Sequence, residues 1–132
     1  MQKAGEARLI DAISPFFIVR DVAEAIGFYH RLGFETRFCA PAEDPFFAIV
    51  GREGAQILLK HQDGVAPTPN AESHPWMSWD AFVYAEDPDA LAADMEARGV
   101  SFHKPLLDRD DGLRGFETRD ADGYVLFFGR PC

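Results

Sequence analysis

The sequence is poor in cysteine and has no long hydrophobic run. Cys39 and Cys132 are the only 2 cysteines in 132 residues, too few for a disulfide scaffold, and they favour a reducing compartment. No stretch approaches the roughly 18 apolar residues that a membrane span needs. The first ten residues carry charges but no apolar h-region, so we predict no signal peptide. The expected location is the cytoplasm.

Basic residues are also scarce. The chain has 13 lysines and arginines against 22 aspartates and glutamates, a net charge of −9 at pH 7. Such a surface repels nucleic-acid phosphates and anionic lipids, so neither nucleic acid nor a membrane is an expected partner. It attracts cationic small molecules, although most surface charges serve only solubility. With 47% hydrophobic residues, the chain predicts a single globular domain over residues 1–132.

The chain repeats one helix pattern after 66 residues. Asp21 precedes an apolar stripe that Gly33 ends, and Asp87 precedes a second stripe that Gly99 ends, twelve residues later in both cases. An aspartate in this position accepts hydrogen bonds from the free amides of the first helical turn. Glycine supplies the left-handed conformation that ends a helix. We therefore predict two helices of about three turns in the same register.

Strand-like segments flank both predicted helices in the same order. One segment precedes each helix and three follow it. These segments are 13–19, 34–39, 46–50 and 55–61 in the first half, and 80–85, 100–106, 113–118 and 124–129 in the second. The proline-containing stretch 62–75 has little apolar content, which is typical of a connection. The pattern predicts a βαβββ module at about 8–61, a connection at 62–75 and a second module at about 76–130.

A supersecondary unit of this length cannot bury its sheet alone, so the two modules must pack together. We predict an α+β fold in which two βαβββ modules form a curved, open-sided eight-stranded sheet. The helices would cover its outer face. Because strand side chains alternate between faces, the other face would line a concave cleft.

Motifs in both halves resemble the glyoxalase/bleomycin-resistance/dioxygenase superfamily. They are Pro15, Val-Arg-Asp21 and Phe28-Tyr-His-Arg-Leu-Gly-Phe34 in the first half, and Trp79-Asp80 and 112–123 in the second. The resemblance covers roughly residues 8 to 130. It implies two βαβββ modules in an open-sided barrel, often within a homodimer. It also implies either metal-dependent lyase, isomerase or dioxygenase activity, or metal-free drug binding.

The resemblance further implies four metal-ligand positions, on the first and last strands of each module. They fall on Ser14, Leu58, Asp80 and Phe127. Only Asp80 is a good ligand for a divalent ion, since leucine and phenylalanine cannot coordinate and a neutral hydroxyl is poor. No two of the four histidines are close enough in sequence to form a local chelate. We therefore expect no metal, no other cofactor and no catalytic residue.

The side chains of the predicted cleft that could bind a ligand are aromatic residues and one carboxylate. Twelve phenylalanines are many for this length. Stacking on such residues suits a flat organic molecule, and Asp80 would hold a cationic group through charge-assisted hydrogen bonds. The predicted ligand-binding residues are Phe38, Phe47, Leu58, His61, Trp79, Asp80, Tyr84, Arg114, Phe116, Glu117 and Phe127.

Two functions remain open at this point. The leading hypothesis is a metal-free protein, expected to be a homodimer, that sequesters a small aromatic or cationic molecule as bleomycin-resistance proteins do. The alternative is a lyase, isomerase or dioxygenase whose displaced metal would be held by some of His61, Asp80 and Glu117. A metal-free enzyme with Asp80 or Glu117 as the base would require a carboxyl pKa raised by burial.

Overall fold

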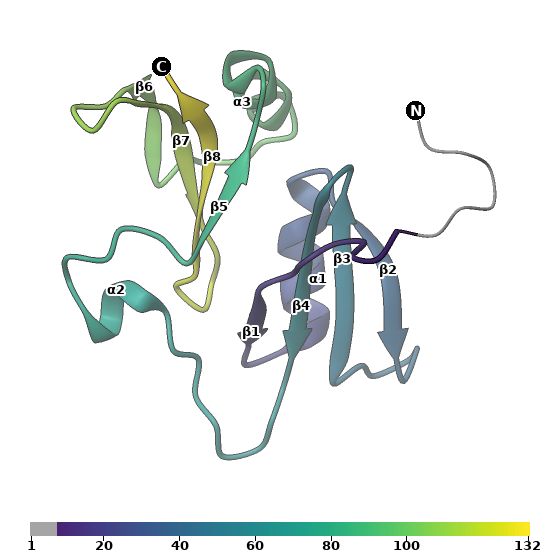
Figure 1. Ribbon diagram of the computed structural model, residues 1–132. Coiled ribbons are helices and arrows are strands. Elements are labelled where there is room, and N and C mark those ends of the chain that lie inside the picture. The colour runs from purple at the N-terminus through teal and green to yellow at the C-terminus, as the bar shows by residue number, and fades with distance from the viewer. Residues whose placement is uncertain (1–7) are drawn as a thin grey trace.

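The computed structural model describes residues 8–132 and contains two modules beside each other (Figure 1). Residues 1–7 lie outside the described residues. The prediction that the chain has no signal peptide rests mostly on these residues. Module one comprises β1 (Phe16–Ile18), α1 (Val22–Arg31), β2 (Glu35–Ala40), β3 (Phe47–Arg52) and β4 (Ala55–Lys60). Module two comprises β5 (Ala81–Tyr84), α3 (Pro88–Ala97), β6 (Lys104–Asp108), β7 (Leu113–Arg119) and β8 (Val125–Pro131). The short α2 (Asn70–Ser73) lies between them, and the predicted α+β fold with its repeated βαβββ order is confirmed.

The eight strands are divided between two four-stranded sheets, where the sequence predicted one curved sheet of eight. The strand orders are β1-β4-β3-β2 and β5-β8-β7-β6, so the repeat extends to the pairing of strands. In each sheet the first and last strands of the module pair in parallel, and the other pairs are antiparallel. The modules meet through contacts of the β7–β8 turn with α1 and the end of β1, and through an ion pair between β3 and α3, rather than through paired strand edges.

Both helices begin and end at the predicted residues. The carboxylates of Asp21 and Asp87 each accept a backbone N–H three residues further on, at 3.0 Å. Gly33 and Gly99 follow the helices with φ angles of 90° and 82°, which a residue without Cβ adopts at little cost. In residues 8–132 neither these helices nor α2 is long and apolar enough to cross a membrane.

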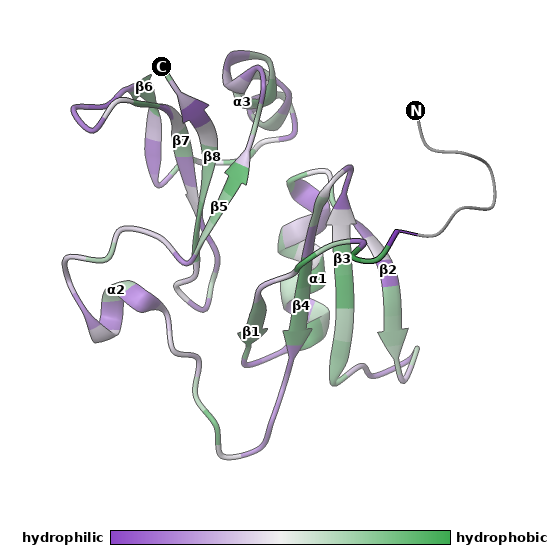
Figure 2. Ribbon diagram, in the orientation of Figure 1, coloured by the Kyte–Doolittle hydropathy of each residue, from purple (hydrophilic) through white to green (hydrophobic). Residues whose placement is uncertain are grey.

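One hydrophobic core joins the helices to both sheets. In Figure 2 the hydrophobic colour is concentrated on the strands, with β3 and β5 among them. Alternation along β4 directs Ile57 and Leu59 into this core, and alternation along β8 does the same for Leu126 and Phe128. At the boundary between the modules the rings of Phe17 and Tyr124 stack with centroids 4.2 Å apart. The two modules therefore share a single core.

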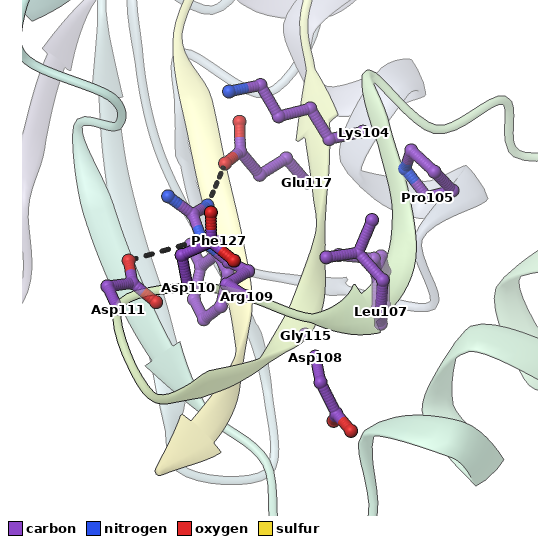
Figure 3. Close-up of a pocket in the computed structure, with 11 residues that line it drawn as sticks. Lys104, Pro105, Leu107, Asp108, Arg109, Asp110, Asp111, Gly115, Glu117 and Phe127 are labelled. Carbon is purple, nitrogen blue, oxygen red and sulfur yellow. Dashed lines mark hydrogen bonds and ion pairs between the residues drawn. The ribbon is translucent and has the colours of Figure 1, made fainter. Parts of the chain in front are cut away.

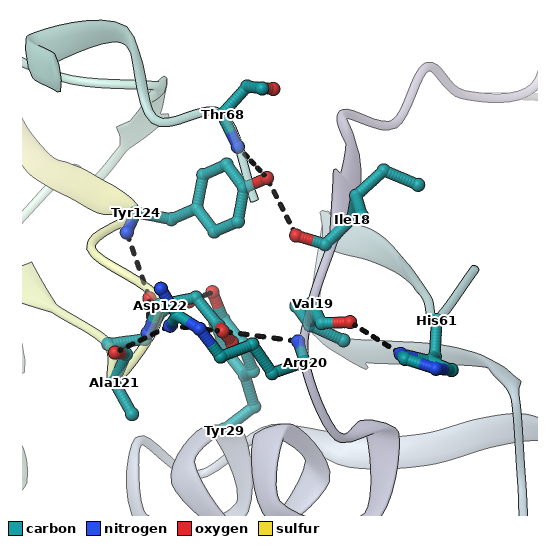
Figure 4. Close-up of polar contacts among 10 residues, drawn as sticks. Ile18, Val19, Arg20, Tyr29, His61, Thr68, Ala121, Asp122 and Tyr124 are labelled. Carbon is teal, nitrogen blue, oxygen red and sulfur yellow. Dashed lines mark hydrogen bonds and ion pairs between the residues drawn. The ribbon is translucent and has the colours of Figure 1, made fainter. Parts of the chain in front are cut away.

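Hydrogen bonds from the β7–β8 turn fix module two against module one (Figure 4). Asp122 Oδ1 accepts the backbone N–H of Arg20 at 3.1 Å and its guanidinium Nη1 at 3.0 Å. The Tyr29 hydroxyl donates to Asp120 Oδ2 at 3.2 Å. The Tyr124 hydroxyl donates to the carbonyl of the last residue of β1 at 2.7 Å. These contacts join segments about a hundred residues apart in the sequence.

Candidate functional site

A cleft of about 410 Å³ lies on module two, lined by β6, the turn that follows it, β7 and β8 (Figure 3). It is on the face of the sheet opposite the core. Glu117 pairs with Phe127 and Phe116 pairs with Phe128 across these two strands. Since side chains alternate between faces, Glu117 and Phe127 face the cleft while Phe128 belongs to the core.

Phe116 was predicted to bind ligand, but its ring lies in the core. It is 0% exposed and stacks on Phe102 and Phe128, with ring centroids 4.5 Å and 5.2 Å away. The ring is on the core face because it is one residue out of phase with Glu117. Phe116 is thus among the residues that border the cleft, but its buried ring offers no exposed surface on which a ligand could stack.

Glu117 is the central polar group of the cleft. Its side chain is 1% exposed, and its Oε2 accepts a hydrogen bond from Arg109 Nη1 at 2.8 Å. Its Oε1 is buried without a hydrogen-bond partner. Leaving a buried acceptor unpaired costs about 1–3 kcal/mol. The cleft therefore contains a polar atom whose bonding capacity the protein does not use.

Arg109 covers the aromatic part of the cleft. Its guanidinium carbon lies 5.3 Å from the ring centroids of both Trp79 and Phe127, a cation–π geometry. Its Nε also pairs with Asp111 at 3.2 Å. Arg109 was not among the predicted binding residues. The available signal was a lone basic residue among aspartates, eight positions before Glu117.

Aromatic side chains from β5, its preceding loop and β8 form a continuous wall. The ring centroids of Trp79 and Phe127 are 4.9 Å apart, those of Phe82 and Phe127 5.0 Å, and those of Phe82 and Tyr84 4.7 Å. Phe127 is fully buried at the base of the wall, whereas Tyr84 is 80% exposed. The structure thus brings together three predicted site residues and adds Phe82 to them.

Asp80, which we predicted to hold a cationic group, is engaged by the main chain. Its Oδ1 accepts the N–H of Asn70 at 2.7 Å, and its Oδ2 accepts the N–H of Val125 at 2.9 Å. The carboxylate therefore ties the connection between the modules to the start of β8. Both of its oxygens already accept a hydrogen bond.

The predicted site residues of module one lie on the other sheet and do not line this cleft. Phe38 and Phe47 contact each other, with ring centroids 6.0 Å apart, and Leu58 lies on the neighbouring β4. His61 Nε2 is 2.9 Å from Asp63 Oδ1. The hydrogen bond to that carboxylate raises the pKa of His61. These four side chains are separate from the group around Glu117.

Arg114 holds structural elements together outside the cleft. Its guanidinium pairs with Asp89 at 2.8 Å and with Asp108 at 3.0 Å. The hydrogen bonds to these carboxylates raise the pKa of Arg114, and the bond to Asp89 lowers the pKa of that carboxyl group. Arg114 therefore links α3 to β6 and β7.

A larger groove of about 900 Å³ lies between the modules, lined by parts of β4, β5 and α3. Of the predicted site residues, Tyr84 borders it. Arg52 pairs with Asp94 at 2.9 Å across this groove. Phe82 and Tyr84 line this groove and not the cleft around Glu117, so the aromatic wall runs from the cleft, where Phe127 lies, toward the groove.

The chain matches a known protein family over most of its length. The family model described as the Glyoxalase/Bleomycin resistance protein/Dioxygenase superfamily matches residues 10–128. The chain belongs to this superfamily. No curated protein matches it.

Several solved structures share the fold. TioX from Micromonospora sp. ML1 is 22% identical, with a TM-score of 0.70 over 92% of this chain and 99% of that chain. A bleomycin-binding protein complexed with bleomycin is 19% identical, with a TM-score of 0.68 over 93% and 100%. A glyoxalase-related enzyme from Clostridium phytofermentans is 15% identical, with a TM-score of 0.70 over 98% and 100%. At these identities the likeness shows the fold alone.

The side chains at the superfamily's metal positions do not fit a metal in this member. Leu58 and Phe127 carry no donor atom, and both oxygens of Asp80 accept main-chain N–H groups. The Ser14 hydroxyl accepts a hydrogen bond from Gln56 Nε2 at 3.2 Å. Nowhere in residues 8–132 do three or more histidine, cysteine or acidic side chains cluster so as to hold a metal ion.

Proposed function

We propose that this superfamily member is a metal-free binding protein that sequesters a small aromatic organic molecule. The observation that carries the proposal is the aromatic wall of Trp79, Phe82 and Tyr84 beside a cleft whose buried Glu117 keeps one oxygen unpaired. Aromatic contacts contribute about 0.5–1.5 kcal/mol each beyond area burial. A flat ligand would gain from the wall, and its polar edge would meet the carboxylate.

Binding without chemistry is favoured by how the two candidate bases are held. A general base must reach the proton that it removes from the substrate. Asp80 accepts two main-chain N–H groups, and Glu117 accepts a guanidinium donor at 2.8 Å. Both oxygens of Asp80 are thus engaged, and the charge of Glu117 is paired with Arg109 while its Oε1 stays available to a ligand N–H. None of the observed contacts favours the lyase, isomerase or dioxygenase alternative.

Bleomycin is the first ligand to test. A structural neighbour of this chain is a bleomycin-binding protein, and a net charge of −9 attracts cationic molecules of that kind. Resistance by sequestration would require only tight binding in the cytoplasm.

The chain contains two tryptophans, Trp76 and Trp79, and fluorescence can therefore isolate the cleft. We expect a saturable fluorescence change with metal-free bleomycin at micromolar concentrations. Trp76 is 77% exposed, so the fluorescence change should persist in Trp76→Phe. It should disappear in Trp79→Phe. No saturable change would remove the drug assignment. Stoichiometric zinc, nickel, manganese or iron in protein purified without chelator would overturn the metal-free function.

We also propose that the protein forms a homodimer. Leu9, Ile10 and Ile13, just before β1, are between 82% and 104% exposed, and Phe16 on β1 is 53% exposed. Large apolar side chains exposed close together along the chain favour an interaction surface there. Sedimentation equilibrium should give about twice the chain mass of 14.7 kDa. A mass near that of one chain would contradict the proposal.

A further inference from the structure

We propose that Glu117 and Lys104 form a donor–acceptor subsite for the edge of a neutral amide or amino-heteroaromatic group. This inference rests on the proposed binding function and specifies the ligand chemistry at one point of the cleft. The ligand's N–H would donate to Glu117 Oε1. Its adjacent carbonyl or ring-nitrogen acceptor would receive a hydrogen bond from the Lys104 ammonium.

The acceptor half of the subsite is the unpaired oxygen of Glu117. Its partner oxygen is bound to Arg109 at 2.8 Å, which fixes the carboxylate plane. The free Oε1 is buried and receives no hydrogen bond within residues 8–132. A ligand N–H that reached it would satisfy an acceptor that the folded protein leaves unused.

The donor half comes from the neighbouring strand. Lys104 on β6 lies directly opposite Glu117 on β7 in the antiparallel pairing, and directly opposed residues share a face of the sheet. Figure 3 shows the free oxygen of Glu117 and the Lys104 amine on the same side of Arg109. No ion pair joins them, and the Lys104 amine has no other partner in the described part of the chain. A small polar group would bridge these two groups.

Local charge favours a neutral ligand group over a cation here. Arg109 already neutralises Glu117, and Lys104 adds a second positive charge beside it. Arg109 divides its charge between Glu117 and Asp111, so a ligand ammonium or amidinium at Oε1 would be repelled chiefly by the neighbouring Lys104 ammonium. A neutral N–H donor meets the same oxygen without that repulsion. The cationic part of a larger ligand would instead lie toward the aspartates of the β6–β7 turn.

The neighbouring wall favours a planar group. Phe127 is the cross-strand partner of Glu117, and Trp79 packs on Phe127 with centroids 4.9 Å apart. Oε1 is buried in this conformation, so a side chain at the cleft must move before a ligand can reach it. Lys104 is exposed at the cleft and has a flexible stem. Its movement would open the site and bring its amine onto the ligand.

Three fragment probes test the subsite on the full chain by ¹H–¹⁵N NMR titration. Benzamide carries the donor and the acceptor, N,N-dimethylbenzamide carries only the acceptor, and benzamidinium carries donors on a cation. We expect benzamide to shift the resonances of Glu117 and Lys104 and to bind about tenfold more tightly than the other two. All three rings are of similar size, so the comparison isolates the polar edge.

Glu117→Gln gives a matched test in the protein. Arg109 would keep the amide oxygen of the glutamine, and the amide nitrogen would replace Oε1, turning the acceptor into a donor. Benzamide binding should weaken about tenfold, while Glu35→Gln on exposed β2 should leave it unchanged. Lys104→Met should weaken benzamide binding severalfold, because the donor is lost while the buried Glu117 carboxylate is kept.

Each contrary outcome has a separate meaning. Equal binding of N,N-dimethylbenzamide and benzamide would overturn the subsite while the binding function stands. Tighter binding of benzamidinium would show that the carboxylate recruits a cation, and stronger benzamide binding by Lys104→Met would show that Lys104 competes with the ligand. Either result overturns the proposal. If none of the probes shifts cleft resonances, the subsite fails, and the bleomycin titration then decides the binding function independently.

Discussion

The Tyr29 hydroxyl donates a hydrogen bond of 3.2 Å to Asp120 Oδ2, 91 residues further along the chain. Tyr29 is 0% exposed and Asp120 is 7% exposed. Burial, together with the nearby Asp120 carboxylate, raises the pKa of Tyr29 well above its ordinary value. The phenol therefore keeps its proton at neutral pH and acts as the donor in this contact between the modules.

Tyr29→Phe should destabilise the fold by about 1–2 kcal/mol, because Asp120 would lose a buried donor while the packing of the ring stays nearly the same. The free energy of unfolding in urea measures this directly. Tyr84→Phe is the matched control, since the Tyr84 side chain is 80% exposed, and it should leave stability unchanged. Equal stability of both variants would mean that the Tyr29–Asp120 bond contributes nothing net.

Asp120 should make stability depend on pH in a defined direction. Burial raises the pKa of Asp120 to about 6, above its unfolded value of about 3.9. The folded state therefore binds this proton more tightly, and the stabilisation is complete below about pH 4 and lost as the pH rises to about 6. Asparagine does not titrate, so the variant lacks this pH-dependent loss of stability. Its free energy of unfolding relative to the wild type should therefore rise by up to about 3 kcal/mol between about pH 4 and pH 7.

Urea unfolding of both proteins across that pH range measures the difference between the two curves. Asp44→Asn, at an exposed position, should instead follow the wild-type curve. Parallel curves for Asp120→Asn and the wild type would show that Asp120 titrates normally in the folded protein.

Asp80→Asn should lower stability while leaving ligand affinity intact. Each Asp80 oxygen accepts a main-chain N–H, from Asn70 and from Val125. An amide NH₂ in place of one oxygen would face one of these donors, at a cost of about 1–3 kcal/mol. Urea unfolding and benzamide titration of the same variant separate the two effects. A large loss of affinity with unchanged stability would assign Asp80 to ligand binding, as the sequence suggested.

Two glycine-to-alanine substitutions should have opposite signs. A Cβ at Gly115 would lie 2.5 Å from the Phe127 ring and would also meet the carbonyl oxygen of Phe128, so Gly115→Ala should destabilise by about 1–3 kcal/mol. A Cβ at Gly27 on α1 would meet nothing within 4 Å. Gly27→Ala should therefore stabilise by about 0.5–1 kcal/mol through helix propensity. Melting temperatures of both variants check the signs.

The fold was readable from the sequence because its signals are local. Asp21 and Asp87 cap their helices within three residues, and Gly33 and Gly99 end them by their own backbone conformation. The division into two sheets was not readable, because it depends on contacts between the β7–β8 turn and module one. Asp122, for example, meets Arg20 from 102 residues away.

The site was readable only in part, for the same physical reason. Trp79, Glu117 and Phe127 were among the predicted binding residues and lie together in the structure, but the sequence could not show that Arg109 folds back over them. The role of Asp80 depends on where the connection runs, since Asn70 supplies one of its donors. Phe116 is one residue out of phase with the cleft, a difference that the sequence pattern alone did not resolve.

The β7–β8 turn belongs wholly to module two, while most of its hydrogen-bond donors and its stacking partner belong to module one. A gene divided within 62–75 would therefore encode two fragments with complementary unsatisfied surfaces. Phe17 would lack the ring of Tyr124 in one fragment, and Asp122 would lack Arg20 in the other. Such fragments should reassociate when co-expressed, which makes this duplicated fold a natural candidate for a split reporter.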